Sequence, residues 1–115
     1  MFDWHIHTHH SPDSHASMSA MARAAYAAGL AGVAFTDHME WMLGDEATGF
    51  LKPPAYFAEL DELRARYNGR LQLLAGMEVG NSHHFPDETR EITSAWPWDY
   101  ILGSIHFVDG QPGWE

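Results

Sequence analysis

Apolar and polar positions alternate at the start of the chain, where Phe2, Trp4 and Ile6 are separated by polar side chains. Successive side chains of a strand point to opposite faces, so this alternation predicts a strand over residues 2–8. We expect its apolar side chains to pack on one face and its histidines to lie together on the other face.

The spacing of apolar positions then becomes helical. From Met18 to Tyr26 apolar residues recur three and four positions apart, as they do in an amphipathic helix. Ser17 or Ser19 can cap the first turn, because a side-chain hydroxyl accepts a hydrogen bond from a free backbone N–H there. We expect the helix to end near Gly29, since glycine readily adopts the backbone conformation that closes a helix.

Two more helices are predicted further along the chain. In residues 54–67 apolar positions recur at four, three and four, and acidic residues precede basic ones, an order that the helix dipole favours. Asn68 and Gly69 are expected to end this helix. A short helix opened by a proline is predicted over residues 86–95. Residues 39–52 have little periodicity and are expected to form a long covering loop.

Three further strands are predicted from short apolar runs at residues 32–36, 71–75 and 100–105. Runs of this kind are typical of strands buried on both faces of a parallel sheet. Each run leads into a side chain that can bind a metal ion. The first run is followed by His38, the second by Glu78 and the third by His106.

The alternation of strands and helices along the chain predicts an α/β fold with a parallel sheet and right-handed crossovers. With 115 residues, 45% of them hydrophobic, the chain is long enough for one domain with a core and too short for two. The carboxyl ends of parallel strands meet at one edge of the sheet. We therefore expect one site that collects His7, His38, Glu78 and His106.

Composition narrows the classes of function. Sixteen acidic and six basic residues give a formal net charge of -10 with histidine neutral, which disfavours nucleic-acid binding through phosphate contacts. The chain has no cysteine, so disulfides and thiolate metal sites are excluded. No stretch approaches the roughly 18 apolar residues of a membrane span, and the start lacks the features of a signal peptide. A soluble, cytoplasmic protein without membrane partners is expected.

Histidine is the unusual residue, because the chain has nine and five of them fall between positions 5 and 15. On a strand, His5 and His7 would place two imidazoles on one face, close enough to chelate one ion. Such a pair is a weak signal alone, since it also occurs in structural roles and in solvated loops. Mixed nitrogen and oxygen ligands, including a carboxylate that could bridge two ions, suit zinc, manganese or iron. The further candidate ligands are Asp13, His38, Glu78 and His106.

Other catalytic arrangements find little support in the sequence. Ser11, Ser14 and Ser17 lie near histidines, but no Gly-x-Ser-x-Gly nucleophile elbow accompanies them. Lys52 is the only lysine, and it does not belong to a glycine-rich phosphate loop. Metal ions would also explain how an acidic chain could accept an anionic substrate, since they neutralise its charge.

Four motifs occur in order along nearly the whole chain. They are Asp3-Trp4-His5-Ile6-His7-Thr8-His9 with Ser11-Pro12-Asp13-Ser14, Phe35-Thr36-Asp37-His38, Gly76-Met77-Glu78-Val79-Gly80 and Gly103-Ser104-Ile105-His106-Phe107. Together they resemble the PHP family (polymerase and histidinol phosphatase), specifically its histidinol-phosphatase branch. The resemblance implies the N-terminal part of a distorted (β/α)7 barrel, with about four parallel strands and intervening helices.

The resemblance also implies a metal cluster of two or three divalent ions at the carboxyl face of the barrel. In this sequence the implied metal ligands are His5, His7, Asp13, His38, Glu78 and His106, with Glu78 as the bridging carboxylate. His15 would replace Asp13 only after a register shift. No catalytic residue beyond metal-bound water and no organic cofactor is implied. Four histidines receive no role and are interpreted as a polar shell, of which His83 or His84 could contact substrate; they are His9, His10, His83 and His84.

Members of this branch are longer than this chain, and their late motifs would follow residue 115. Four strands cannot close such a barrel, because they leave an open edge and an uncovered core face. We therefore expect residues 1–115 to be a truncated PHP domain. The alternative is a homo-oligomer in which a second chain supplies the missing ligands and the missing edge.

The function that the resemblance implies is hydrolysis of a small phosphorylated substrate. The expected reaction converts L-histidinol phosphate and water to L-histidinol and phosphate, a step of histidine biosynthesis. One alternative is a PHP phosphoesterase acting on nucleotides or oligonucleotide ends, which the acidic charge and the form of the last motif disfavour. Another is an inactive metal-binding fragment that folds only with a partner.

Overall fold

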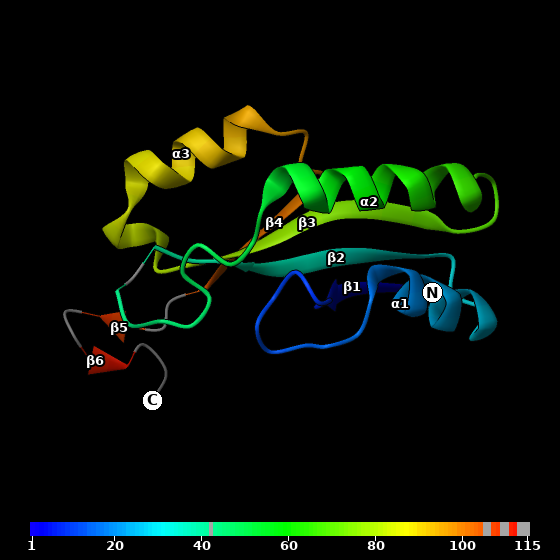
Figure 1. The fold of residues 1–115 in the computed structure, drawn as a ribbon, viewed down its shortest axis with the longest axis horizontal. Helices are drawn as coiled ribbons and strands as arrows, with labels where there is room; N and C mark the ends of the chain where they lie inside the picture. The colour runs from blue at the N-terminus through cyan, green and yellow to red at the C-terminus, as the bar shows by residue number, and fades with distance from the viewer. Residues whose placement is uncertain (42, 105–106, 109–110, 113–115) are drawn as a thin grey trace.

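Four parallel strands form the main sheet of this α/β fold, in the spatial order β1-β2-β3-β4 (Figure 1). The computed structural model describes residues 1–41, 43–104, 107–108 and 111–112. The strands of the main sheet are β1 (Phe2–Ile6), β2 (Gly32–Met39), β3 (Gln72–Gly80) and β4 (Tyr100–Ser104). Each neighbouring pair is parallel, as the sequence predicts.

Three α-helices connect the strands at the positions that the sequence predicts. They are α1 (Met18–Ala27), α2 (Pro53–Arg66) and α3 (Pro86–Ala95). Two features are not predicted from the sequence: the 3-10 helix η1 (Ser82–His84), and an antiparallel pair formed by β5 (Phe107–Val108) and β6 (Gln111–Pro112). Residues 39–52 hold no helix in their described part, which agrees with the expected loop.

Local chemistry explains where the helices begin and end. The Ser17 side chain accepts a hydrogen bond from the Ala20 backbone N–H at 3.0 Å, so Ser17 is the cap of α1. Gly29 follows the end of α1 with a φ of 79°, a left-handed conformation that favours glycine. Helices α2 and α3 each have a proline in the first turn, where no backbone N–H donor is needed.

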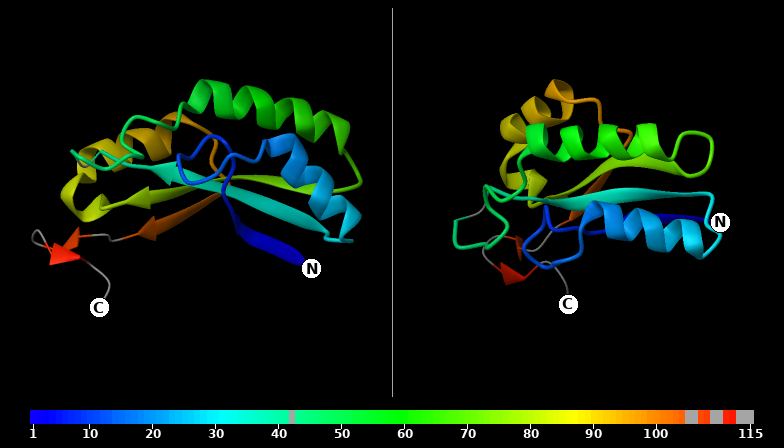
Figure 2. Two further views of the ribbon diagram at one scale, coloured as in Figure 1. Left: turned by 60° about the horizontal axis from the view of Figure 1, so that its bottom comes forward. Right: turned by 45° about the vertical axis from the view of Figure 1, so that its right-hand side comes forward.

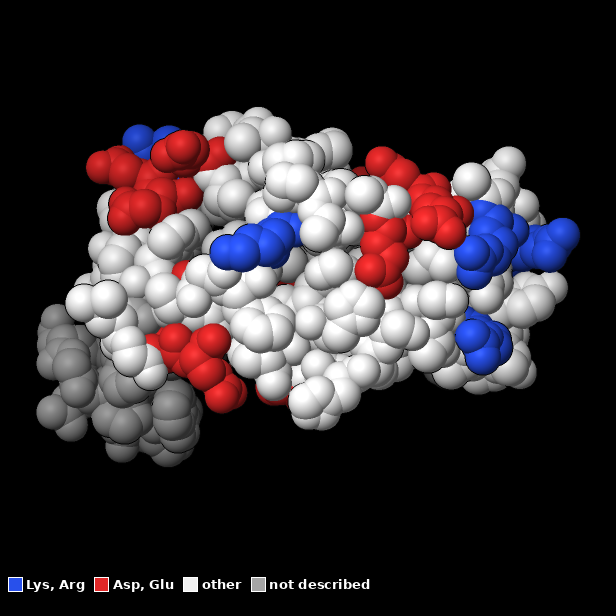
Figure 3. Space-filling view, in the orientation of Figure 1, with Lys and Arg blue, Asp and Glu red and all other residues white. Residues whose placement is uncertain are grey.

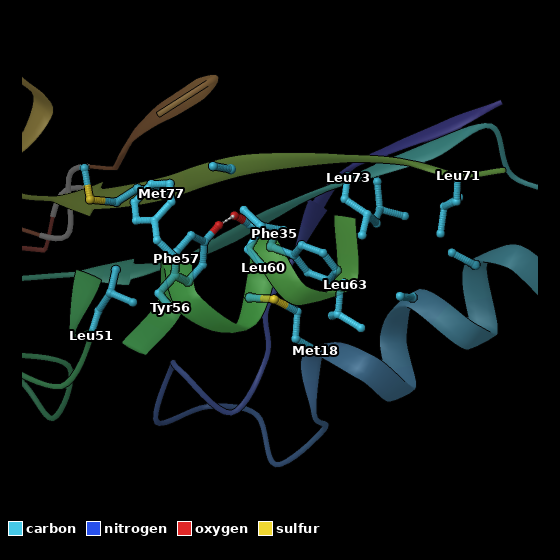
Figure 4. Packing of buried hydrophobic residues seen from close by; sticks show 14 of the residues in the cluster. Met18, Phe35, Leu51, Tyr56, Phe57, Leu60, Leu63, Leu71, Leu73 and Met77 are labelled. Atoms are coloured by element: carbon cyan, nitrogen blue, oxygen red, sulfur yellow. Dashed lines mark hydrogen bonds between the residues drawn. The ribbon is translucent and has the colours of Figure 1, made fainter. Parts of the chain in front are cut away.

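The hydrophobic core lies between the sheet and two of the helices. The left-hand view of Figure 2 shows α1 and α2 over the same face of the sheet. Figure 4 shows how side chains from α1, α2, β2 and β3 point toward one another in this core. Its fully buried large members include Met18, Phe35, Tyr56, Leu60 and Met77. The buried apolar runs at 32–36 and 71–75 therefore form the central strands, as predicted.

Core side chains and candidate ligands lie on opposite faces of β2 and β3. Phe35 and Met77 belong to the hydrophobic cluster. His38 and Glu78 lie at the alternate positions and are directly paired across the two strands. Because alternate residues of a strand face opposite sides, one face of these strands packs on the helices and the other carries His38 and Glu78. The parallel register therefore brings two candidate ligands together.

The predicted common apolar face of β1 is wrong, whereas its histidines His5 and His7 lie together as predicted. Its pairing with β2 is regular at Asp3 and shifts before Ile6, so that three residues of β1 advance beside two of β2. A bulge of this kind changes which face the following side chains point to. Ile6 packs against the core, but Trp4 does not, and its ring stacks on Phe2 at 4.8 Å between centroids.

The sheet curls so strongly that its two outer strands approach each other. Trp4 on β1 and Tyr100 on β4 have ring centroids 5.7 Å apart, although two strands separate them in the sheet. Strands of a closed barrel curl in this way. The four strands and their helices therefore make the half-barrel that the sequence predicts.

Charged side chains are unevenly distributed over the face drawn in Figure 3. Basic side chains gather mainly beyond the end of α2, at the right-hand end of the view, while acidic side chains lie over α2 and α3. The last turn of α2 contributes Arg64 and Arg66, and the first turn of α3 contributes Asp87 and Glu88. Among the helices in the described part of the chain, none is long and apolar enough to cross a membrane.

Candidate metal centre

Five of the six predicted metal ligands converge at the carboxyl end of the sheet. His5 and His7 lie at the end of β1, His38 is the second-last residue of β2, and Glu78 lies near the end of β3. Asp13 reaches the same place from the loop between β1 and α1. The sixth, His106, lies outside the described residues.

The first group of ligand atoms surrounds one oxygen of Glu78. Glu78 Oε1 is 2.6 Å from His5 Nε2 and 3.2 Å from His7 Nε2. The two histidine Nε2 atoms are 3.0 Å apart. Because the bulge in β1 turns His5 and His7 toward the face that carries Glu78, three ligand atoms from two strands point at one small volume.

The second group of ligand atoms surrounds the carboxylate of Asp13. Asp13 Oδ2 is 2.9 Å from His7 Nδ1 and 3.0 Å from His38 Nε2. The other nitrogen of His38, Nδ1, is 3.2 Å from Glu78 Oε2. Glu78 Oε1 therefore belongs to the first group, and Glu78 Oε2 contacts the His38 nitrogen opposite the one that faces Asp13.

The electrostatics of the centre are those of histidines around a carboxylate. Burial alone raises the pKa of Glu78, but the His7 hydrogen bond, the charge of His38 and the His5 hydrogen bond outweigh it and lower that pKa to about 2. The hydrogen bond to Glu78 raises the pKa of His7, which burial opposes and Asp13 reinforces. The ionised Glu78 carboxylate therefore attracts cations to this end of the sheet.

A buried carboxylate, Asp37, holds the loop that carries Asp13. Its Oδ1 accepts hydrogen bonds from the Thr8 backbone N–H at 2.5 Å and from Ser11 Oγ at 2.8 Å, and its Oδ2 accepts one from Thr8 Oγ1 at 2.8 Å. Ser11 Oγ in turn accepts a hydrogen bond from the His38 backbone N–H at 2.8 Å. Asp37 is fully buried, so these contacts tie the loop directly to β2.

The sequence motifs contain Ser11 and Asp37, but they do not predict that these side chains position the loop. The available signal is the position of Asp37 itself, because a carboxylate that follows a buried apolar run needs hydrogen-bond donors.

The histidines without a predicted role fall into three cases. His15 is exposed and joins none of the groups of converging ligand atoms in the described part of the chain, whereas Asp13 does. His83 and His84 are exposed neighbours in η1, with ring centroids 3.9 Å apart; contact of either with substrate stays a prediction. His9 and His10 both contact Glu59 on α2.

The donor atoms present at the centre fit divalent metal ions. Ligand bonds of about 2.0–2.1 Å in a tetrahedral arrangement separate neighbouring donor atoms by roughly 3.3 Å. Most of the separations within the two groups, from 2.6 to 3.2 Å, approach this value. Imidazole nitrogen together with carboxylate oxygen suits zinc, manganese and iron. His5, His7 and Glu78 could hold one ion, and Asp13 together with His38 Nε2 could contribute to a second.

Comparison with known families agrees with this geometry. The PHP domain family matches residues 3–114. The chain belongs to the PHP family. The match covers all four motifs on which the resemblance was based, so the sequence prediction of the family is confirmed.

Curated proteins similar to the chain include histidinol-phosphatases. The chain is 29% identical over 106 residues to the histidinol-phosphatase of Lactococcus lactis, covering 92% of this chain and 39% of that protein. It is 30% identical over 109 residues to a probable histidinol-phosphatase of Deinococcus radiodurans, covering 92% of this chain and 42% of the relative. The chain thus spans about two fifths of the length of these relatives.

A solved PHP structure has the same fold. The histidinol phosphate phosphatase of Lactococcus lactis, crystallised with zinc, L-histidinol and phosphate, superposes with a TM-score of 0.86 at 28% sequence identity. The match covers 95% of this chain and 41% of that one. The four-stranded half-barrel described above is therefore part of a PHP barrel, which confirms the predicted fold class.

Proposed function

We propose that this chain forms the metal-binding part of a phosphatase that hydrolyses L-histidinol phosphate. The proposed metal ligands are the five that converge at the end of the sheet, together with His106 from the fourth motif. The observation that carries the proposal is the pair of adjacent ligand groups that share His7, with both oxygens of Glu78 in contact with histidine. The reaction belongs to histidine biosynthesis.

The related structure supports the class of substrate. Its protein was crystallised with zinc, L-histidinol and phosphate, which are a metal ion and the two products of the proposed reaction. The curated relatives carry the histidinol-phosphatase name at 27–30% identity. We extend zinc and the substrate to this chain because the imidazole nitrogens and carboxylate oxygens at its own centre suit zinc.

The residues of the chain prepare the centre for an anionic substrate. When bound, two or three divalent ions would supply positive charge for the phosphate and acidify a water molecule that can act as nucleophile. His5 and His7 would bind through Nε2, the atoms that face Glu78. The Nδ1 atom of His7 contacts Asp13 at 2.9 Å, and such contacts fix the orientation of a ligating imidazole.

The test is phosphate release from L-histidinol phosphate by the zinc-reconstituted chain, with adenosine monophosphate as the competing substrate. We expect release from L-histidinol phosphate, a loss of at least about 100-fold in Glu78→Gln, and a similar loss after chelation. Glu62→Gln is the matched control, because Glu62 is an exposed glutamate on α2 that contacts only Arg66 among the ion pairs described.

Two results would contradict the proposal at different levels. Phosphate release that survives both chelation and Glu78→Gln would exclude a metal-dependent mechanism at this centre. Equal or faster release from adenosine monophosphate would retain the phosphoesterase chemistry and exclude L-histidinol phosphate as the preferred substrate.

A further inference from the structure

A second convergence of histidine and carboxylate side chains lies beside the proposed phosphatase centre and shares no residue with it. His9 and His10 belong to the loop between β1 and α1, and Glu59 lies in the second turn of α2. The Nε2 atoms of His9 and His10 are each 3.2 Å from the same oxygen, Glu59 Oε2. The three ligand atoms lie within 4.8 Å of one another.

The spacing of these atoms is that of ligands around one ion. Tetrahedral zinc with bonds of about 2.0–2.1 Å places neighbouring donor atoms roughly 3.3 Å apart. Both nitrogen-to-oxygen distances are 3.2 Å, longer than the usual 2.7–2.9 Å of a charge-assisted hydrogen bond. Two imidazoles directed at one carboxylate oxygen therefore have room for a cation between them.

His10 is held in place independently of Glu59. Its side chain is only 10% exposed, and its ring packs edge-on against Tyr56 with centroids 5.5 Å apart. The backbone N–H of His10 also donates to Thr8 Oγ1 at 3.2 Å. A ligand whose orientation is fixed by packing loses little freedom on binding, which favours a preformed site.

We propose that His9, His10 and Glu59 bind a divalent cation, with zinc as the best fit to two imidazole nitrogens and one carboxylate oxygen. A fourth position is open to water, since His9 is 42% exposed. The ion joins the loop to α2. Because the same loop carries Asp13, this cation positions a ligand of the phosphatase centre without touching the reacting atoms.

The test counts zinc per chain by elemental analysis after dialysis against a weak chelator. Glu59→Gln keeps an oxygen that can accept an imidazole N–H, but it removes the anionic ligand. We expect Glu59→Gln to bind one equivalent less than the unmodified chain, and Glu62→Gln on the same helix to bind the full number. His9→Gln, at an exposed position, provides a second variant if Glu59→Gln folds poorly by circular dichroism.

A Glu78→Gln background separates this site from the phosphatase centre. There we expect one equivalent of zinc to remain and to be lost in the Glu78→Gln/Glu59→Gln double variant. Cobalt substituted into the Glu78→Gln chain should give the visible absorption of a four-coordinate site, which Glu59→Gln abolishes. Unchanged zinc content in both Glu59→Gln and His9→Gln would overturn the proposal and leave a hydrogen-bonded cluster, whatever the outcome of the phosphatase assay.

Discussion

Replacing Asp37 with alanine is expected to free the loop that carries Asp13 and to weaken the metal centre without removing a ligand. The buried Asp37 carboxylate accepts three hydrogen bonds from this loop, two from Thr8 and one from Ser11. In Asp37→Ala these donors lose their acceptor inside the protein. The loop should then no longer hold Asp13 beside His38.

The expected cost follows from the number and type of bonds lost. A hydrogen bond to a charged group contributes about 1.5–3 kcal/mol, so removing three should lower the free energy of unfolding by roughly 4 kcal/mol or more. Asp37→Asn retains one side-chain oxygen, which can still accept hydrogen bonds from the Thr8 N–H and from Ser11 Oγ. The Thr8 hydroxyl can rotate and accept a hydrogen bond from the new amide group. Its cost should be about 1–2 kcal/mol.

Urea denaturation followed by circular dichroism measures both variants, and a chromophoric chelator measures zinc affinity in parallel. We expect Asp37→Ala to weaken zinc binding by about 10–100-fold, as the loss of a residue that orients a ligand commonly does. Asp61→Ala is the control, because Asp61 is 70% exposed on α2 and its removal should change stability by no more than about 0.5 kcal/mol.

The reasoning fails if Asp37→Ala costs less than about 1 kcal/mol, since the three hydrogen bonds would then contribute little. It also fails if the alanine and asparagine variants are equally stable, because the retained acceptor distinguishes them. A stability loss with unchanged zinc affinity would refute only the link between the loop and the centre.

Two other perturbations test the core and the charge balance. Tyr56→Phe removes a fully buried hydroxyl that donates to the Phe35 carbonyl at 2.7 Å and accepts from the Gly76 N–H at 3.0 Å, and it should lower the free energy of unfolding by about 2 kcal/mol in urea denaturation. In the metal-free chain, the lowered pKa of Glu78 adds stability above pH 4.5 that is lost as pH falls toward 2. The raised pKa of His7 adds stability below pH 6.5 that is lost as pH rises through that pKa. The urea midpoint should therefore be highest between pH 4.5 and 6.5, and Glu78→Gln should flatten this dependence; a midpoint that rises steadily above pH 6.5 would contradict it.

Local patterns predicted most of the fold because they reflect local physics. The recurrence of Tyr56, Leu60 and Leu63 at helical spacing indicates α2, and Pro86 opens α3 at the predicted position. The bulge in β1 could not be predicted, because alternation assumes a regular strand. It appears only in the pairing with β2, whose register shifts between Asp3 and Ile6.

The candidate centre was predictable to the extent that strand ends determine it. Parallel strands bring their carboxyl ends together, so His38 and Glu78 could be expected at one edge of the sheet, and the register then pairs them directly. The contacts of His10 with Glu59, and of Ser11 with Asp37, join positions 49 and 26 residues apart. No periodicity relates such positions, and only the packed structure reveals them.

The shifted pairing of β1 has a thermodynamic consequence. Among the main strands described, β1 pairs only with β2. Its irregular register interrupts the backbone hydrogen bonds that hold it to β2. His5 and His7 lie at the far end of this weakly fastened strand, so any ion bound there favours the docked strand by mass action. Metal binding and docking of β1 are therefore linked equilibria. The backbone amides of Trp4 and His5 should exchange hydrogen more slowly as the zinc concentration rises.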